Sequence, residues 1–182
     1  MAGNVTKSED IAAVVAATVK AFSGISTLVN NVGWGGRHDD PTAITDDDFI
    51  ASYKLNTRSA YRMSMACLLR LLRAKNATIT NSGSYSSVTP AYAILAYGTA
   101  KAALNQMMVL IAHMLVKKVR VNSVLIGTVM PAGYGAAGID EAMQEKLRNP
   151  DNLTGRPGRP EDVANALLWL CSPTSSCQFF AP

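Results

Sequence analysis

The chain has 182 residues, of which 48% are hydrophobic and 16% are charged, a composition that fits one globular domain and excludes intrinsic disorder. No apolar run reaches the ~18 residues of a membrane-spanning helix, and the N-terminus carries no apolar signal-like region. The net charge of +4 is modest and the basic residues are dispersed, so we expect neither a nucleic-acid nor a membrane partner.

The cysteines form an odd set of three, Cys67, Cys171 and Cys177, without C-x-x-C spacing. This pattern indicates neither a disulfide framework nor a metal site. Cys67 and Cys171 lie in apolar helical stretches and are expected to be inert packing residues. A reducing, cytoplasmic location is therefore the default expectation.

The first half of the chain is predicted to contain helix, strand and helix. An apolar stripe from Ile11 to Phe22 indicates a helix, opened by a capping box at Thr6-x-x-Glu9. The β-branched segment Thr27–Val32 is typical of a buried parallel strand. A long helix is predicted to begin at Thr45-x-x-Asp48 and to run to about Arg73.

The second half repeats this alternation. A strand is predicted at Thr78–Asn81 with its flanks, a helix at Ile94–Leu115 and a strand at Val119–Ile126. A last helix begins at Pro160, a favoured first helical position, and runs to about Cys171. The order predicts an α/β protein with a doubly wound parallel sheet and helices on both faces, forming a single domain over residues 1–182.

Tyr97 and Lys101 are the first candidates for chemistry, since Tyr97-Gly-Thr-Ala-Lys101 places a phenol and an ammonium on one helical face. A neighbouring cation favours the phenolate, which would lower the tyrosine pKa from its usual value of ~10. A tyrosine that ionises near neutrality is a useful proton donor and acceptor. Taken alone, the spacing also fits an ordinary exposed pair.

Polar residues follow the predicted strands. Ser84 stands in Asn81-Ser-Gly-Ser84, just past a strand, and carboxyl ends of strands are where open α/β sheets bind ligands. Its hydroxyl could donate a hydrogen bond to a substrate carbonyl oxygen; the alternative is a turn residue. Asn56 lies inside a predicted helix, where asparagine is a mediocre helix former, and the alternative is an exposed surface residue.

Together these features resemble the short-chain dehydrogenase/reductase family, from about Asn4 to Ser176. Asn30-Asn31-Val32-Gly33 is similar to the family's N-N-A-G motif, with valine for alanine. Asn56, Ser84, Tyr97 and Lys101 match its active-site Asn, Ser and Y-x-x-x-K. Val119-Arg-Val-Asn122-Ser and Arg159-Pro-Glu-Asp-Val-Ala164 are similar to a later strand and helix start.

The resemblance implies an oxidoreductase that interconverts a secondary alcohol and a ketone with NAD or NADP. Tyr97 would exchange a proton with the substrate, Lys101 would lower the Tyr97 pKa and hold the nicotinamide ribose, and Ser84 would polarise the carbonyl. Asn56 would anchor a water molecule in a proton relay. The implied cofactor-binding residues are Asn4, Val5, Asn31, Val32, Gly33, Tyr97, Lys101, Gly127 and Val129.

The resemblance also implies partners. The substrate would be a small apolar alcohol or ketone, as in bacterial hydroxysteroid dehydrogenases and 3-oxoacyl reductases. Trp34 and the segment Met130–Leu147, with Tyr134, Met143 and Leu147, are candidates for its pocket. A homodimer or homotetramer is expected, assembled through the helices at Thr45–Arg73 and Ile94–Leu115.

Some family features have no counterpart. The chain begins where the family has D-V-T after its third strand, reads Asn4-Val5-Thr6, and contains no T-G-x-x-x-G-x-G turn for the pyrophosphate. The Gly133–Gly138 segment fits G-x-G-x-x-G, but no strand runs into it. The family's P-G-x-x-x-T motif reads Ile126-Gly-Thr-Val-Met-Pro131 here and so loses its final threonine, and Ser176–Pro182 replaces the last strand. We therefore expect a partial fold that binds NAD(H) and NADP(H) weakly and is inactive in isolation.

Two alternatives follow from these departures. One is a catalytically dead, truncated member of the family or an interaction subunit. The other, a serine hydrolase that uses Ser84 and His113, is disfavoured because Ser84 lacks the G-x-S-x-G setting. Replacing Asn56 or Ser84 by alanine is expected to impair turnover with little loss of folding stability.

Overall fold

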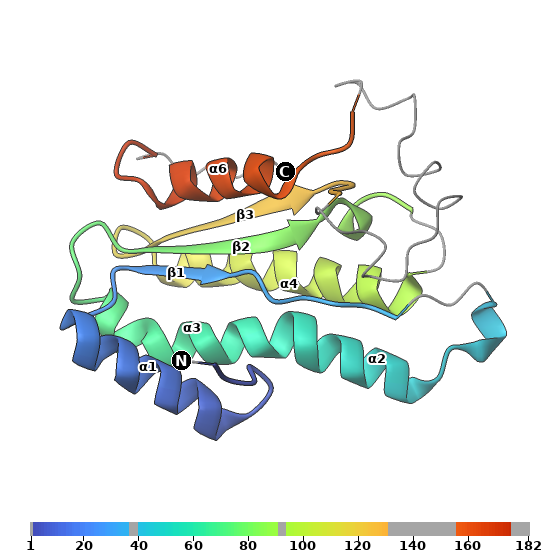
Figure 1. Ribbon diagram of the computed structural model, residues 1–182, viewed down its shortest axis with the longest axis horizontal. Coiled ribbons are helices and arrows are strands. Elements are labelled where there is room, and N and C mark those ends of the chain that lie inside the picture. Colours follow the sequence, from blue (N-terminus) through green and yellow to red (C-terminus); the bar gives the residue numbers. More distant parts are fainter. Residues whose placement is uncertain (1, 37–39, 91–93, 131–155, 176–182) are drawn as a thin grey trace.

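The computed structural model describes residues 2–36, 40–90, 94–130 and 156–175. Strands and helices alternate along the chain, as Figure 1 shows. The elements are α1 (Ser8–Phe22), β1 (Thr27–Asn30), α2 (Asp46–Tyr53), α3 (Ser59–Leu71), β2 (Thr78–Ser84), α4 (Leu95–Met114), β3 (Arg120–Ile126) and α6 (Pro160–Cys171). Short 3₁₀ turns occupy Pro41–Ala43 and Tyr85–Ser87, and a π-helical turn, Lys54–Arg58, joins α2 to α3.

The described strands form one parallel sheet in the order β1-β2-β3. Asn30 pairs with Asn81 at the end of β1, and Ser84 pairs with Ile126 at the end of β2. All seven residues of the central strand β2 are buried. The strands therefore end at one edge of the sheet, as the alternating sequence pattern predicts.

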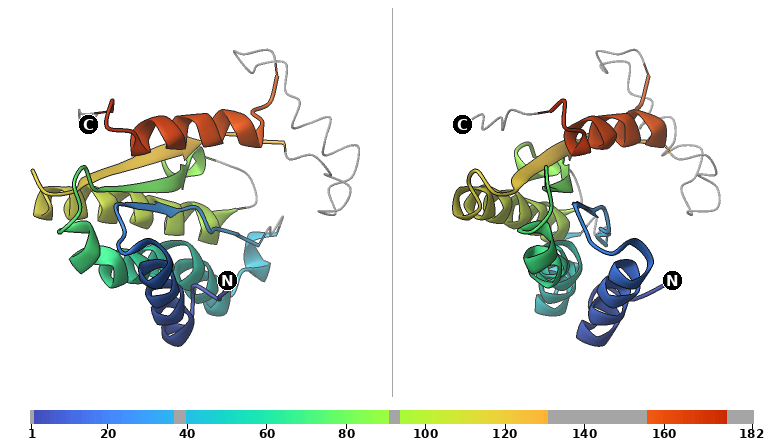
Figure 2. Two further views of the ribbon diagram at one scale, coloured as in Figure 1. Left: turned by 60° about the vertical axis from the view of Figure 1, so that its left-hand side comes forward. Right: turned by 90° about the vertical axis from the view of Figure 1, so that its left-hand side faces the viewer.

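Helices cover both faces of the sheet. Figures 1 and 2 show α6 on one face and α4 with α3 on the other, with α1 packed against α3. The core between α3, α4 and the sheet contains side chains with almost no exposed surface, among them Leu71, Ile79, Leu104 and Val119. This arrangement confirms the predicted parallel sheet with helices on both faces.

Two helix starts differ in outcome. The capping box at Thr45 is present, since Thr45 N–H donates to Asp48 Oδ2 at 2.8 Å and Asp48 N–H donates to Thr45 Oγ1 at 3.3 Å. The capping box predicted at Thr6 is wrong. The Thr6 hydroxyl and N–H instead donate to Asn4 Oδ1, at 2.7 and 2.9 Å, and α1 begins at Ser8 with Lys7 as its N-cap.

The strand bounds also shift. β1 ends at Asn30, two residues before the predicted end, because the chain leaves the ladder where the Asn31 side chain accepts a hydrogen bond from Ser82 Oγ at 2.7 Å. β2 runs on to Ser84, so that serine is the last residue of the strand rather than a residue beyond it. The helix predicted at Thr45–Arg73 is divided by the π-helical turn and ends at Leu71.

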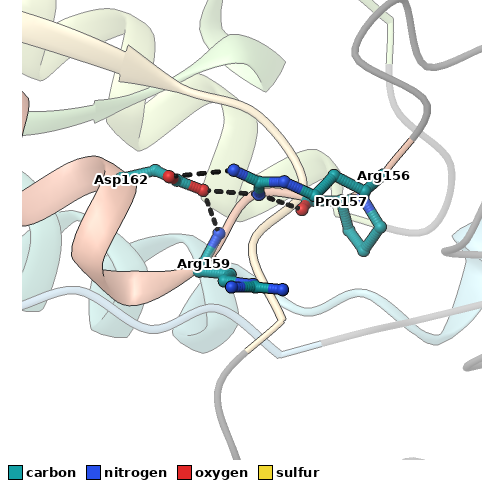
Figure 3. A network of polar contacts seen from close by, with 4 residues as sticks. All are labelled: Arg156, Pro157, Arg159 and Asp162. Carbon is teal, nitrogen blue, oxygen red and sulfur yellow. Dashed lines mark hydrogen bonds and ion pairs between the residues drawn. The ribbon is translucent and has the colours of Figure 1, made fainter.

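Two polar networks fix the C-terminal helix. The Arg120 guanidinium, on β3, donates to the carbonyl oxygens of Leu170, Ser172 and Ser175, at 2.9, 3.1 and 2.5 Å. At the other end, Figure 3 shows that the Asp162 carboxylate accepts hydrogen bonds from both terminal guanidinium nitrogens of Arg156, at 2.7 and 3.1 Å, and from the Arg159 N–H at 2.8 Å. α6 is thus tied at both ends.

Candidate active site

α4 positions the tyrosine and lysine of the motif against the sheet. Its buried stripe, which includes Ala96, Ala100 and Leu104, holds one helical face toward β2. Lys101 lies on this face with 2% of its surface exposed, and its Nζ donates to the Ser82 carbonyl oxygen at 2.8 Å. The same Nζ lies 5.6 Å from the centre of the Tyr97 ring. The predicted pairing of Tyr97 and Lys101 is therefore a buried contact rather than an exposed one.

Burial controls the protonation of both groups. It lowers the pKa of Lys101 to about 8, because the ammonium loses solvation. It also raises the pKa of Tyr97, while a hydrogen bond from Ser84 lowers it. The expectation that the Tyr97 pKa falls is therefore wrong for the protein without ligand, since desolvation of the phenolate outweighs the stabilising contacts.

Ser84 lies at the carboxyl end of β2, beside the tyrosine. Its Oγ lies near enough to the Tyr97 hydroxyl to lower the pKa of that group, and it hydrogen-bonds to Ser86 Oγ at 2.8 Å. The Ser86 N–H also donates to it, at 3.3 Å. A serine and a tyrosine hydroxyl thus meet where the strand ends, which is an arrangement suited to a single substrate oxygen.

Asn56 lies within the π-helical turn and has no exposed surface. Its amide bridges two segments. Nδ2 donates to the carbonyl oxygens of Trp34 and Ser52, at 2.7 and 2.9 Å, and Oδ1 accepts from the Trp34 N–H at 3.2 Å. The interpretation of Asn56 as an exposed surface residue is therefore wrong, and its role in a water relay stays a prediction. π-helical turns are frequent at functional sites.

The segment that follows β1 runs directly over the lysine. A Cβ atom on Gly33 would lie 2.8 Å from both Asn56 Oδ1 and Lys101 Nζ, and one on Gly35 would collide with the Tyr97 side chain. Glycine is needed at these positions because the backbone approaches the polar side chains so closely. Gly33 was a predicted site residue, whereas Gly35 was not.

Ser82 is the site residue that the sequence reasoning missed. Its carbonyl oxygen accepts from Lys101 and its hydroxyl donates to Asn31 Oδ1 at 2.7 Å. It therefore links the lysine to the asparagine motif. Its place at the end of a buried strand was the available signal.

The other predicted cofactor residues lie in two separate places. Val5, Asn31 and Val32 line one largely apolar cavity of about 250 Å³ between α1, β1 and α3. Asn4 is exposed, and its Oδ1 is engaged by Thr6. Gly127 and Val129 follow β3, where Val129 pairs with Gly158 beside the Arg156–Asp162 ion pair.

Several predicted features lie outside the described residues: Tyr134, Met143, Leu147, Cys177 and the Gly133–Gly138 segment. Within the described ranges, no three His, Cys, Asp or Glu side chains are grouped as metal ligands. None of the helices described there has the length and apolar character needed to cross a bilayer. Cys67 is buried, and Cys171 Sγ lies 3.6 Å from Thr80 Oγ1; both are free thiols.

Comparison with known proteins identifies the family. The profile of the family described as "Enoyl-(Acyl carrier protein) reductase" matches residues 1–178. The chain is 31% identical over 180 residues to the 4-formylbenzenesulfonate dehydrogenase TsaC1/TsaC2 of Comamonas testosteroni, covering 97% of this chain and 71% of that protein. It is also 31% identical to the 7alpha-hydroxysteroid dehydrogenase of Clostridium sardiniense, covering 94% of this chain and 66% of that protein.

A solved structure supports the same assignment. The 7α-hydroxysteroid dehydrogenase complexed with NADH and 7-oxo glycochenodeoxycholic acid superposes with a TM-score of 0.85 at 25% identity. The match covers 96% of this chain and 67% of that one, so the chain spans about two thirds of its relatives' length. The chain belongs to the short-chain dehydrogenase/reductase family and is by family an oxidoreductase.

Proposed function

We propose that this protein interconverts a secondary alcohol and a ketone through Ser84, Tyr97, Lys101 and Asn56, with a nicotinamide dinucleotide as cofactor. The observation that carries the proposal is the buried Lys101 ammonium, which is held by the Ser82 carbonyl oxygen 5.6 Å from the ring of Tyr97, beside Ser84 at the end of β2. Two hydroxyls and a cation at the carboxyl edge of a parallel sheet suit a carbonyl group that gains or loses a proton.

In the reduction direction, the Tyr97 hydroxyl donates its proton to the carbonyl oxygen, and Ser84 Oγ donates a hydrogen bond to the same oxygen. The Lys101 ammonium stabilises the tyrosinate that forms, since an opposite charge in a buried site acts strongly. In the oxidation direction the proton returns from the alcohol to Tyr97. Asn56 holds the Trp34 backbone, and with it the loop over the lysine.

The residues present fit a nicotinamide riboside. Lys101 Nζ uses one of its three N–H bonds on Ser82, and among the described residues no second acceptor engages it, so two remain for hydroxyl groups of a ribose. Because Gly33 has no side chain, there is room beside Lys101 Nζ. When bound, the nicotinamide accepts or supplies the hydride. Both NAD and NADP are compatible with this half of the site, and a relative of similar fold is complexed with NADH.

We propose a small apolar substrate and a homo-oligomeric, cytoplasmic protein. Trp34, 71% exposed, follows the asparagine motif and precedes Gly35, whose backbone lies against the Tyr97 side chain. Relatives act on 4-formylbenzenesulfonate and on hydroxysteroids, as their names state. An apolar groove of about 480 Å³ between α2 and α4, lined by Phe49 and Ile50 among others, suits assembly of a homodimer or homotetramer.

One observation favours a second candidate, a non-catalytic interaction subunit. β1 is an outer strand of the described sheet, Val29 on it is 42% exposed, and the apolar cavity of about 250 Å³ lies beside it. An open apolar strand edge tends to recruit another chain. The chain would then contribute its sheet edge to an assembly rather than turn over substrate.

The two candidates are separated by an assay of cofactor-dependent ketone reduction. The purified protein is mixed with millimolar NADH or NADPH and a panel of cyclic and extended ketones. The proposal predicts turnover that Ser84→Ala lowers about 100-fold and that Ser26→Ala, on an exposed loop, leaves unchanged. Absence of turnover on every ketone, with a stable complex between this chain and another protein, would support the interaction subunit instead.

A further inference from the structure

A third polar residue follows the motif along α4. Tyr97, Lys101 and Asn105 are spaced four residues apart, so they lie on one face of the helix. Asn105 Nδ2 donates to Ser87 Oγ at 2.5 Å. Its Oδ1 is buried and accepts no hydrogen bond from any described residue. A buried amide oxygen without a partner is costly, so the orientation of this side chain requires a compensating gain.

Ser87 links Asn105 to β2, the strand that ends in Ser84. Its Oγ accepts from Asn105 and donates to the Ser84 carbonyl oxygen, also at 2.5 Å. Ser87 is the last residue of the 3₁₀ turn Tyr85–Ser87, which begins directly after Ser84. The two hydrogen bonds therefore tie the end of β2 to α4 at the point where the Ser84 side chain turns toward Tyr97.

Gly83 shows how closely Asn105 is fitted to this strand. A Cβ atom at position 83 would lie 2.8 Å from Asn105 Oδ1, and it would also lie 3.0 Å from Val124 O. The strand residue next to Ser84 therefore has no side chain at the point where Asn105 packs. Asn105 touches β2 beside Ser84 and holds the turn after it, whereas Lys101 holds the Ser82 carbonyl before it.

We infer that Asn105 is a positioning residue, which acts through the Ser87 hydroxyl to fix Ser84 in hydrogen-bonding distance of Tyr97. The inference rests on the proposed function for the role of Ser84. A carbonyl clamped by Ser87 fixes the backbone of Ser84, so its Oγ points to the Tyr97 hydroxyl and not to solvent. Loss of the clamp leaves Ser84 Oγ free to turn toward Ser86 alone, with which it already shares a 2.8 Å hydrogen bond.

The consequence is measurable in the protein without ligand. The hydrogen bond from Ser84 lowers the pKa of Tyr97, against the opposing effect of burial. Weakening that bond should raise the Tyr97 pKa, by about half a pH unit or more. The Tyr97 ionisation can be followed by NMR of isotope-labelled tyrosine, with Tyr97→Phe used to assign its signal. This readout does not depend on cofactor or turnover.

The test uses matched substitutions at each end of the relay. Asn105→Leu keeps roughly the size of the side chain and adds no charge but removes the donor to Ser87, and Ser87→Ala removes the relay itself. Both should raise the Tyr97 pKa, and their double variant should raise it no further, because the two groups act in series. Ser87→Thr keeps the hydroxyl and should restore the original value. Gln106→Ala, at the exposed neighbouring position of α4, is the control.

The outcomes are distinct from those that test the proposed function. A protein without turnover whose Tyr97 pKa still rises in both variants upholds the positioning role and defeats only the proposed reaction. In an active protein, both variants should lower kcat about tenfold or more with KM little changed. If Asn105→Leu does not fold, Ser87→Ala decides. An unchanged Tyr97 pKa in a folded Ser87→Ala protein overturns the inference and leaves Asn105 a packing residue.

Discussion

The Nζ of Lys101 donates a hydrogen bond to the carbonyl oxygen of Ser82 at 2.8 Å, which ties the cation of α4 to the strand that ends in Ser84. The ammonium is thereby held close to the Tyr97 ring while it stays almost fully buried. Burial of an ammonium in this position lowers the stability of the fold, because the charge loses solvation.

Lys101→Met should therefore separate stability from function. Since the Lys101 pKa is lowered to about 8, the unfolded chain binds more protons between pH 8 and ~10.5, and the free energy of unfolding should rise with pH across that window. This rise amounts to at most ~1.4 kcal/mol per pH unit, and the methionine variant should lack it. Near neutrality the variant should be no less stable than the wild type. Denaturant unfolding at several pH values measures it. Parallel pH profiles of the free energy of unfolding for the two proteins would show that burial does not lower the pKa of Lys101.

Asn56→Ala should destabilise the fold, contrary to the expectation from helix propensity. The buried amide makes hydrogen bonds to both backbone groups of Trp34, and their loss should cost ~1–2 kcal/mol. Thermal unfolding measures this loss. The matched control is Asn165→Ala, because Asn165 is an exposed asparagine inside α6. A stability equal to that of the wild type would mean that the bridge to Trp34 contributes nothing.

Gly33→Ala should disturb the loop over Lys101. The added Cβ atom would lie 2.8 Å from Asn56 Oδ1 and Lys101 Nζ, and the shift that relieves this should cost ~1–3 kcal/mol. Gly24→Ala is the matched control because nothing lies within 4 Å of its added Cβ, and it should be neutral or slightly stabilising. Calorimetric melting of the two variants compares them. Equal melting temperatures for the two variants would show that the loop does not approach Lys101 so closely.

The start of α6 should weaken in acid. The Arg156 guanidinium and the Arg159 N–H lower the pKa of Asp162 to about 2, below its unfolded value of ~3.9. The contribution of this carboxylate is therefore complete above pH ~4 and is lost as the pH falls toward 2. Asp162→Asn should show a smaller loss of stability over that range than the wild type, by acid titration of the unfolding midpoint. Identical acid profiles would exclude a role for the ion pair.

Much of the architecture could be predicted because it rests on local patterns. The β-branched runs of β2 and β3 and the capping box at Thr45 predict their elements from short-range physics alone. The bounds of β1 could not be predicted, because they depend on the contact between Asn31 and Ser82, which are 51 residues apart. The capping box at Thr6 failed for a related reason, since Asn4 competed for the same hydroxyl.

The site shows the same division. Resemblance to a family supplied Ser84, Tyr97 and Lys101, and the structure brings them together. The direction of the Tyr97 pKa could not be predicted, because the spacing of a helix gives the neighbouring cation but not the desolvation that outweighs it. Backbone contacts, such as those of Ser82 O with Lys101 and Trp34 with Asn56, leave no signal in side-chain patterns.

The central claim, that Tyr97 exchanges the proton in a dinucleotide-dependent reaction, is tested most directly by comparing Tyr97→Phe with the wild type in ketone reduction at millimolar NADH or NADPH. The exposed Tyr61→Phe serves as the control. In any form of the protein that turns over, we expect Tyr61→Phe to match the wild type, and Tyr97→Phe to lose more than ~100-fold in kcat while it remains folded. Near-normal kcat in a folded Tyr97→Phe protein would contradict the proton-transfer role and, with it, the proposed mechanism.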